Sequence, residues 1–348
     1  MSTSRNLTLI IMALVAVLAL VGCTREITTV EQIDPGASNC FNCHTDDPET
    51  DQYGLTDKQL EWSFSNHGIG AYVGYAGGRN GCSGCHSGAG FVARLDGATD
   101  VPYATTIGCW ACHAPHTTGD FALRINEPQP LSNGLMRDIG SSNICTACHV
   151  ARTAVDVALA PEFPDSTVGG VPLDQVRITS SHWGGHHGPQ GEMFYGNNGY
   201  HFDGYTYRTD VPPAHDVEGM TRCFGCHGNA NPVVDLGGHS FQQRNTAGDM
   251  NVASCNRCHD ALVDFDVNGV QTETAELLET LHGLLETLGL VDVDGHPISG
   301  ARGTEVQVGA AWNFINVEED RSMGVHNPNY IHDLLTSSIA ALGGAPAK

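Results

Sequence analysis

The sequence has few basic residues. Its 16 lysines and arginines stand against 39 aspartates and glutamates, which gives a formal net charge of −23. Nucleic acids and anionic membrane surfaces attract basic patches, so this balance argues against nucleic acid as a partner. It favours basic partners or cationic metal species, although a solvated acidic surface accounts for the same charge.

The sequence also lacks an apolar run of full membrane-spanning length near its start. Residues 7–21 are apolar, Arg5 precedes them, and the run ends Leu20-Val21-Gly22-Cys23. This ending resembles the lipobox of bacterial lipoproteins, in which the cysteine becomes the lipidated N-terminus. The resemblance predicts an export signal at 1–22 and a lipid anchor on Cys23 that attaches the chain to the cell envelope, at the outer membrane or cell surface. An uncleaved anchor helix with an incidental cysteine is the alternative.

No cysteine except Cys23 lies outside a repeated pattern. The other twelve form six Cys-x-x-Cys-His motifs, numbered here in chain order, at residues 40–44, 82–86, 109–113, 145–149, 223–227 and 255–259. Disulfide scaffolds are usually shorter and have no matched histidines, and a thioredoxin-like pair would occur once. Zinc ribbons do not need a histidine after every cysteine pair.

The motif spacing matches covalent haem attachment. Two thiols three residues apart reach the two vinyl groups of one haem edge, and the adjacent histidine lies under the iron as its proximal ligand. The sequence therefore predicts six haem c groups. The predicted thioether residues are Cys40, Cys43, Cys82, Cys85, Cys109, Cys112, Cys145, Cys148, Cys223, Cys226, Cys255 and Cys258. The predicted proximal ligands are His44, His86, His113, His149, His227 and His259.

The second axial ligand of each iron bears on function, because a second histidine closes the iron to substrate. Of the 18 histidines, the 12 that lie outside the motifs are the candidates for the second axial ligands. The cluster His182, His186 and His187 supplies at least one, and we favour His187, followed by His182. The six predicted distal ligands are His67, His116, His187, His215, His239 and His326. Each has a surface histidine as its alternative.

One of these histidines lies in a recognisable C-terminal stretch. Residues 324–330, followed by Leu334 and Leu335, resemble the C-terminal histidine motif of the multihaem c-type cytochrome superfamily, and residues 310–314 are similar to its closing helix. That superfamily includes the cytochrome c nitrite reductases and their electron-carrying relatives. The resemblance implies that His326 is a distal ligand. The Cys-x-x-Cys-Lys motif usual in the nitrite reductases is absent from this sequence.

The remaining composition predicts a fold of the multihaem cytochrome c class. With 42 glycines and 16 prolines, we expect a haem-cored chain that is mostly coil with α-helices and has little β structure. Leu277, Leu281, Leu284 and Leu288 recur at helical spacing and predict a helix at 272–290. Further helices are expected at about 304–322 and 329–342.

The motif spacing also predicts an organisation of the chain. The expected segments are the signal at 1–22, a linker after the lipidated cysteine at 23–39, a four-haem region at 40–150, a histidine-rich connecting region at 151–222, a two-haem region at 223–260, and a helical C-terminal region at 261–348 that supplies a distal histidine.

Residues 264–269 partly match a calcium-binding loop. Asp264, Asp266 and Asn268 match the first half of a calcium loop, but Ala275 stands where the loop needs glutamate. Ca²⁺ is therefore a possible cofactor, with a plain polar turn before the helix as the alternative.

These features favour an electron carrier over an enzyme. We expect electron transfer through six closely packed haems with two histidine ligands each, in extracellular or periplasmic respiratory electron transport at the bacterial outer envelope. The expected partners are other redox proteins such as cytochromes, a larger conduit, or a filament of the chain itself. The alternative is a multihaem reductase of a small nitrogen or sulfur oxyanion with one open iron. The scarcity of cations argues against an anion-binding pocket of that kind.

Overall fold

The structure, a computed structural model, describes residues 54–98, 101, 103–118, 120–161, 167–168, 171–172 and 175–345. The predicted export signal, Cys23 and motif 1 lie outside the described residues. Helix and coil dominate, and the described strands form three two-stranded antiparallel ladders: β1 (Gln129–Pro130) with β2 (Met136–Arg137), β3 (Thr167–Val168) with β4 (Val171–Pro172), and β5 (Val176–Arg177) with β6 (Arg302–Gly303). The predicted fold class is therefore confirmed at the level of secondary structure.

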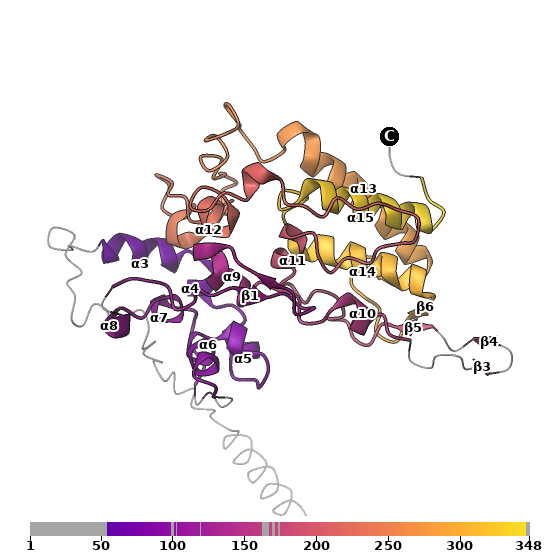
Figure 1. The fold of residues 1–348 in the computed structure, drawn as a ribbon, viewed down its shortest axis with the longest axis horizontal. Coiled ribbons are helices and arrows are strands. Elements are labelled where there is room, and N and C mark those ends of the chain that lie inside the picture. The colour runs from indigo at the N-terminus through magenta and orange to yellow at the C-terminus, as the bar shows by residue number, and fades with distance from the viewer. Residues whose placement is uncertain are drawn as a thin grey trace, which may run out of the picture. The chain divides into compact units, whose positions relative to one another are not determined.

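Helices are short in the part of the chain that carries the motifs (Figure 1). The α-helices there are α3 (Leu55–Ser63), α4 (Asn66–Ile69), α5 (Ser83–His86), α6 (Gly88–Leu95), α7 (Cys109–Cys112), α8 (Pro115–Thr118), α9 (Asn143–Thr146), α10 (Val155–Ala158), α11 (Gln190–Phe194) and α12 (Arg222–His227). Single turns of other helix types are η1 (Val73–Gly77), η2 (Gly140–Ser142), η3 (Pro213–His215), η4 (Gly238–Ser240) and η5 (Val267–Gly269).

Three longer helices form what we call the C-terminal bundle: α13 (Val270–Thr287), α14 (Glu305–Asp320) and α15 (Pro328–Ala341). Their ends have local causes. Thr304 and Gln307 form a reciprocal capping box at the start of α14. Asn327 caps α15, and Pro328 occupies its first turn, where a missing N–H costs nothing. The three helices lie close to the ranges that the sequence predicts.

The buried face of α13 is wider than the predicted leucine stripe. Leu277 and Leu281 are buried as expected, but Leu284 is only half-buried and Leu288 is 40% exposed. Leu285, outside the stripe, is fully buried. Since α13 packs against both α14 and α15, its apolar surface faces two neighbours rather than one.

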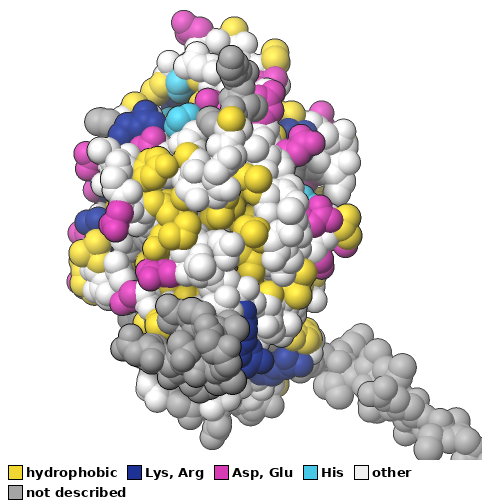
Figure 2. All heavy atoms as spheres, turned by 90° about the vertical axis from the view of Figure 1, so that its right-hand side faces the viewer, with side chains coloured by type: hydrophobic (Ala, Val, Ile, Leu, Met, Phe, Trp, Pro, Cys, Tyr) yellow, Lys and Arg dark blue, Asp and Glu magenta, His cyan; other side chains and the backbone are white. Residues whose placement is uncertain are grey.

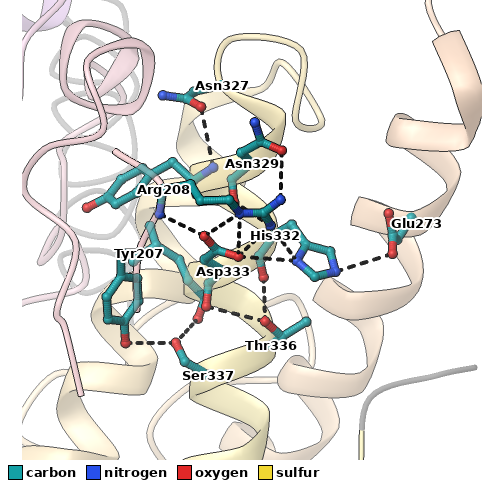
Figure 3. Close-up of polar contacts among 11 residues, drawn as sticks. Tyr207, Arg208, Glu273, Asn327, Asn329, His332, Asp333, Thr336 and Ser337 are labelled. Carbon is teal, nitrogen blue, oxygen red and sulfur yellow. Dashed lines mark hydrogen bonds and ion pairs between the residues drawn. The ribbon is translucent and has the colours of Figure 1, made fainter. Parts of the chain in front are cut away.

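A strap at residues 198–208 closes over α14 and α15. The Trp312 indole donates to the backbone oxygen of Asn198 at 2.6 Å, and the Tyr330 hydroxyl accepts from the Gly199 amide at 3.0 Å. At the end of the strap, Arg208 donates to the Asp333 carboxylate, with Nε 2.9 Å and Nη2 2.6 Å from its two oxygens (Figure 3). The connecting segment is thereby fixed to the bundle.

Figure 2 shows hydrophobic side chains gathered on one face of the molecule, with acidic side chains around them. Large apolar side chains exposed on the bundle and on the segments packed against it are Val157, Leu288, Val293, Ile298 and Val306. Among the described residues, no helix combines the length and the apolar character needed to cross a bilayer.

Candidate haem-binding site

Each described motif forms one helical turn. A backbone hydrogen bond from the histidine N–H to the carbonyl of the first cysteine closes the turn in motifs 2, 3, 4 and 6, at 2.9–3.0 Å, and motif 5 lies within α12. Positions i, i+3 and i+4 share one face of a helix, so both thiols and the imidazole lie on the same side. None of the ten described cysteines forms a disulfide. This is the arrangement that covalent haem attachment requires.

Four motif histidines face a histidine from a distant part of the chain. The ring centroids are 6.2 Å apart for His86 and His186, 6.5 Å for His113 and His239, 6.2 Å for His149 and His67, and 6.4 Å for His227 and His326. An axial Fe–N bond is about 2 Å long and the ring centre lies about 1 Å beyond the nitrogen, so an iron between two imidazoles separates their centres by about 6 Å. The donor pairs fit a haem iron.

For the two remaining motif histidines, His259 and His44, the described residues give no ring-to-ring distance to a second histidine. His259 of motif 6 lies close enough to His215 that burial and the His259 charge together lower the pKa of His215. His116 lies in α8 with its ring edge-on to Trp110, at a centroid distance of 5.2 Å. His44 lies outside the described residues.

The histidine cluster after β5 differs from the sequence expectation. His186, rather than the favoured His187, faces His86, and burial together with the Arg152 charge lowers the pKa of His186 to about 4. His187 instead directs Nδ1 at Glu319, and this hydrogen bond raises its pKa. Both histidines have positive φ, 57° and 56°, an uncommon backbone that accompanies the divergence of their rings.

Four of the eight paired histidines have a hydrogen-bond acceptor at Nδ1. The acceptors are Phe121 O for His113 (2.7 Å), Gln190 Oε1 for His149 (3.2 Å), Phe241 O for His227 (2.9 Å) and Asp320 Oδ1 for His326 (2.6 Å). A hydrogen bond at Nδ1 fixes the tautomer and the ring orientation, which leaves Nε2 for the metal. Gln190 lies 41 residues from its histidine, whereas the other three acceptors lie within 14 residues of theirs.

The protonation state of several rings suits metal ligation, because only a neutral imidazole can bind iron. Burial, with the nearby His149, lowers the pKa of His67 to about 4. Burial also lowers the pKa of His227 to about 4. His326 differs: burial disfavours its charged form, but the Asp320 carboxylate outweighs this and raises its pKa.

The motifs contact one another through their thiols. The Cys85 side chain of motif 2 hydrogen-bonds with Cys148 of motif 4, and Cys145 of motif 4 hydrogen-bonds with Cys223 of motif 5. The Cys148 sulfur also lies 3.9 Å from the carbonyl oxygen of Gly84. Motif 4 therefore joins motif 2 to motif 5.

The carboxylate of the candidate calcium loop already has partners. Asp266 accepts from the Gln271 amide at 2.7 Å and from the Thr272 hydroxyl at 2.5 Å, so it caps the start of α13. Asp264 accepts from the Asp266 amide at 3.0 Å. These bonds are those of the polar turn that the sequence left as the alternative.

Comparison with known proteins points to the same chemistry. No protein-family model matches the chain. It is 24% identical over 220 residues to the C-type polyheme cytochrome OmcB of Geobacter sulfurreducens, which covers 54% of this chain and 27% of OmcB. The chain thus spans about a quarter of the length of that curated relative.

Solved structures extend the similarity to the fold. The outer cell wall cytochrome OcwA superposes with a TM-score of 0.50 at 20% identity, over 82% of this chain and 50% of OcwA. An undecahaem cytochrome from the S-layer of Carboxydothermus ferrireducens gives a TM-score of 0.48 over 81% of this chain. The fold of this chain is therefore similar to that of OcwA, and the proteins that it resembles in sequence and in fold are multihaem c-type cytochromes.

Proposed function

We propose that the chain carries six haem c groups, each held between two histidines, and that it relays electrons at the bacterial outer envelope. The haem, when bound, supplies one-electron exchange at its iron. The proposed axial pairs are His86 with His186, His113 with His239, His149 with His67, His227 with His326, His259 with His215 and, by elimination, His44 with His116.

The observation that carries this proposal is the repeated histidine pairing. Four pairs from different parts of the chain have ring centroids 6.2–6.5 Å apart. Surface histidines have no reason to recur at one separation opposite four different motifs. With both axial positions taken by imidazoles, an iron exchanges electrons without binding substrate.

The contacts between motifs support a continuous route. Cys85 contacts Cys148, and Cys145 contacts Cys223, so the edges of neighbouring haems on motifs 2, 4 and 5 would lie next to one another. Electrons then pass through motif 4 between the N-terminal and the later motifs. The protein contributes fixed positions and fixed ligand orientation rather than proton transfer.

The relatives and the N-terminal sequence support the proposed cellular setting. OcwA is an outer cell wall cytochrome, and the lipobox-like residues ending at Cys23 support export and a lipid anchor. Extracellular or periplasmic electron transport, with other redox proteins or further copies of this chain as partners, is consistent with both. Asp266 is committed to capping, which makes bound Ca²⁺ at residues 264–269 a weaker proposal than the haems.

The deciding experiment compares His186→Ala with His187→Ala in haem-loaded protein. The matched pair removes adjacent histidines of which only His186 faces a motif histidine. Electron paramagnetic resonance of the parent protein should show only low-spin haem. The His186 variant should gain one high-spin haem that binds cyanide, whereas the His187 variant should remain low-spin.

Two results would contradict the proposal. A high-spin signal from the His187 variant alone would return the ligand to the residue that the sequence favours. A high-spin, ligand-binding haem in the parent protein would instead mean one open iron, and the chain should then be assayed as an oxyanion reductase.

A further inference from the structure

One arginine connects two haem-attachment motifs. Arg94 lies in the last turn of α6, directly after motif 2. Its Nη1 lies 3.6 Å from the Cys85 sulfur of motif 2, and its Nη2 donates to the backbone oxygen of Ala147 at 3.0 Å. Ala147 is a spacer residue of motif 4. A single guanidinium thus contacts two attachment turns that lie far apart in sequence.

The surroundings of Arg94 keep its side chain in this position. A Cβ on Gly84, a spacer residue of motif 2, would lie 2.9 Å from the Arg94 Cδ, so the arginine stem runs directly over this glycine. The guanidinium carbon is 5.0 Å from the centre of the Phe91 ring, one turn earlier in α6. Phe91 is buried in the same apolar cluster as Ala147. These contacts hold the Arg94 guanidinium between motif 2 and motif 4, at a place that we call the joint.

The joint is also where the two motifs touch. The Cys85 side chain hydrogen-bonds with Cys148, and the Cys148 sulfur lies 3.9 Å from the Gly84 oxygen. If these sulfurs carried haems, Arg94 would lie near both attachment sites. A positive charge near a haem favours the reduced iron, and because Arg94 is exposed, water screens part of this effect. Arginine stays charged at any physiological pH, so this influence is permanent.

We propose that Arg94 is a positioning residue that holds motifs 2 and 4 edge to edge and raises the reduction potentials of both haems. This inference rests on the proposed electron-transfer function. It assigns a role to a side chain that is neither an axial ligand nor a thioether residue.

The test is a potentiometric titration of haem-loaded Arg94→Gln, Arg94→Lys and a control, Arg177→Gln. Arg177 lies in β5, against the C-terminal bundle, so its loss removes the same charge away from this joint. In Arg94→Gln, two haems should become about fivefold harder to reduce, roughly 40 mV at 59 mV per tenfold for one electron. Arg94→Lys keeps the charge but loses the forked geometry, so its shift should be less than half as large.

The outcomes separate this inference from the function on which it rests. Intact mass fixes the haem count first: if the parent protein does not load six haems, the proposed function fails, whatever Arg94 does. With full loading, a shift in Arg94→Gln equal to that in the control, or confined to one haem, would overturn the role of Arg94. If Arg94→Gln loses a haem, Arg94→Lys decides. Because lysine keeps the charge, a fall of about 40 mV or more in both potentials, at 59 mV per tenfold, would overturn the effect of the charge. An unchanged rate of electron transfer between the two haems would overturn the positioning role.

Discussion

The C-terminal bundle and the motif-bearing part of the chain, residues 54–149 and 211–260, are stabilised in different ways. Among the largest fully buried side chains of the described residues, only Ile139 belongs to the motif-bearing part. Its apolar cluster has four buried residues, Phe91, Ala111, Ile125 and Ala147. The bundle, with the segments at 155–202 packed on it, forms a cluster of 24 buried apolar side chains. The bundle thus has a large side-chain core, and the motif-bearing part has a small one.

The difference indicates where the haems contribute to folding. Ile69, Tyr72 and Tyr75 are 61%, 66% and 57% exposed, and the Tyr72 ring lies 6.4 Å from that of His86. Apolar side chains left in water cost about 25 cal/mol per Å², so a chain gains by covering them. A porphyrin bound at motif 2 would cover such surfaces. We therefore infer that the motif-bearing part folds with its haems, while the bundle folds on its own side chains.

The largest expected effect comes from removing the haem of motif 4. In Cys145→Ala/Cys148→Ala, intact mass should fall by one haem, and hydrogen exchange should rise across motifs 2 to 5, because motif 4 contacts both its neighbours. Residues 270–341 should stay protected. The matched control, Cys255→Ala/Cys258→Ala at motif 6, should lose one haem with increased exchange only near residues 250–265. Equal loss of protection in the bundle would contradict the comparison.

The next effect comes from the bundle core. Leu281 is fully buried, so Leu281→Ala should lower the free energy of unfolding of the bundle by about 2–5 kcal/mol. The control Leu288→Ala, at a position 40% exposed, should cost less than about 1 kcal/mol. Chemical denaturation followed by far-ultraviolet circular dichroism measures both. The haem absorption spectrum should not change in either variant, and a shifted Soret band in Leu281→Ala would show that the two parts are not independent.

The bundle was predictable from sequence because its signals are local. Helical spacing of leucines, the Thr304 cap and Pro328 at a helix start act within a few residues. The 40% exposure of Leu288 was not predictable, since the sequence does not tell how many neighbours α13 has. The motif turns were likewise predictable, because cysteine and histidine lie within one turn of backbone.

The partners of the motif histidines could not be predicted with the same certainty. His186 and His187 are adjacent in sequence, and only the tertiary placement of motif 2 and of Glu319 distinguishes them. The Nδ1 acceptor of His149, Gln190, is 41 residues away, and the Ala147 carbonyl is 53 residues from Arg94. No periodic pattern relates positions at such separations. The assignment of distal ligands stays a prediction until the variants are measured.

A smaller effect is expected at His326, which lies between α14 and α15 and whose ring faces that of His227 in motif 5. Asp320 accepts from His326 Nδ1 at 2.6 Å and places a negative charge behind the ring. Asp320→Asn keeps an acceptor oxygen but removes the charge. One haem should become about three- to tenfold easier to reduce, roughly 30–60 mV at 59 mV per tenfold. A redox titration beside Asp292→Asn, a half-buried control outside the motif-bearing part, measures this. An unchanged potential in Asp320→Asn would mean that His326 is not an axial ligand.

The smallest effect is expected at the clamp that fixes the strap to the bundle (Figure 3). Arg208 donates to both carboxylate oxygens of Asp333 and, at 2.9 Å, to Asn329 Oδ1. Because the Arg208 side chain is 53% exposed, water screens the pair, and Arg208→Gln should cost only about 0.5–1 kcal/mol of bundle stability. That cost should shrink in 0.5 M salt, where exposed charges are screened within a few ångströms.

A double-mutant cycle with Asp333→Asn isolates the ion pair from the other contacts of Arg208. A coupling energy under about 1 kcal/mol, with the haem potentials unchanged, is the expected result. A larger coupling accompanied by a shifted potential would mean that the strap carries strain from the bundle into residues 211–227, where motif 5 begins. The bundle would then control the haems through its surface as well as through the His326 ring.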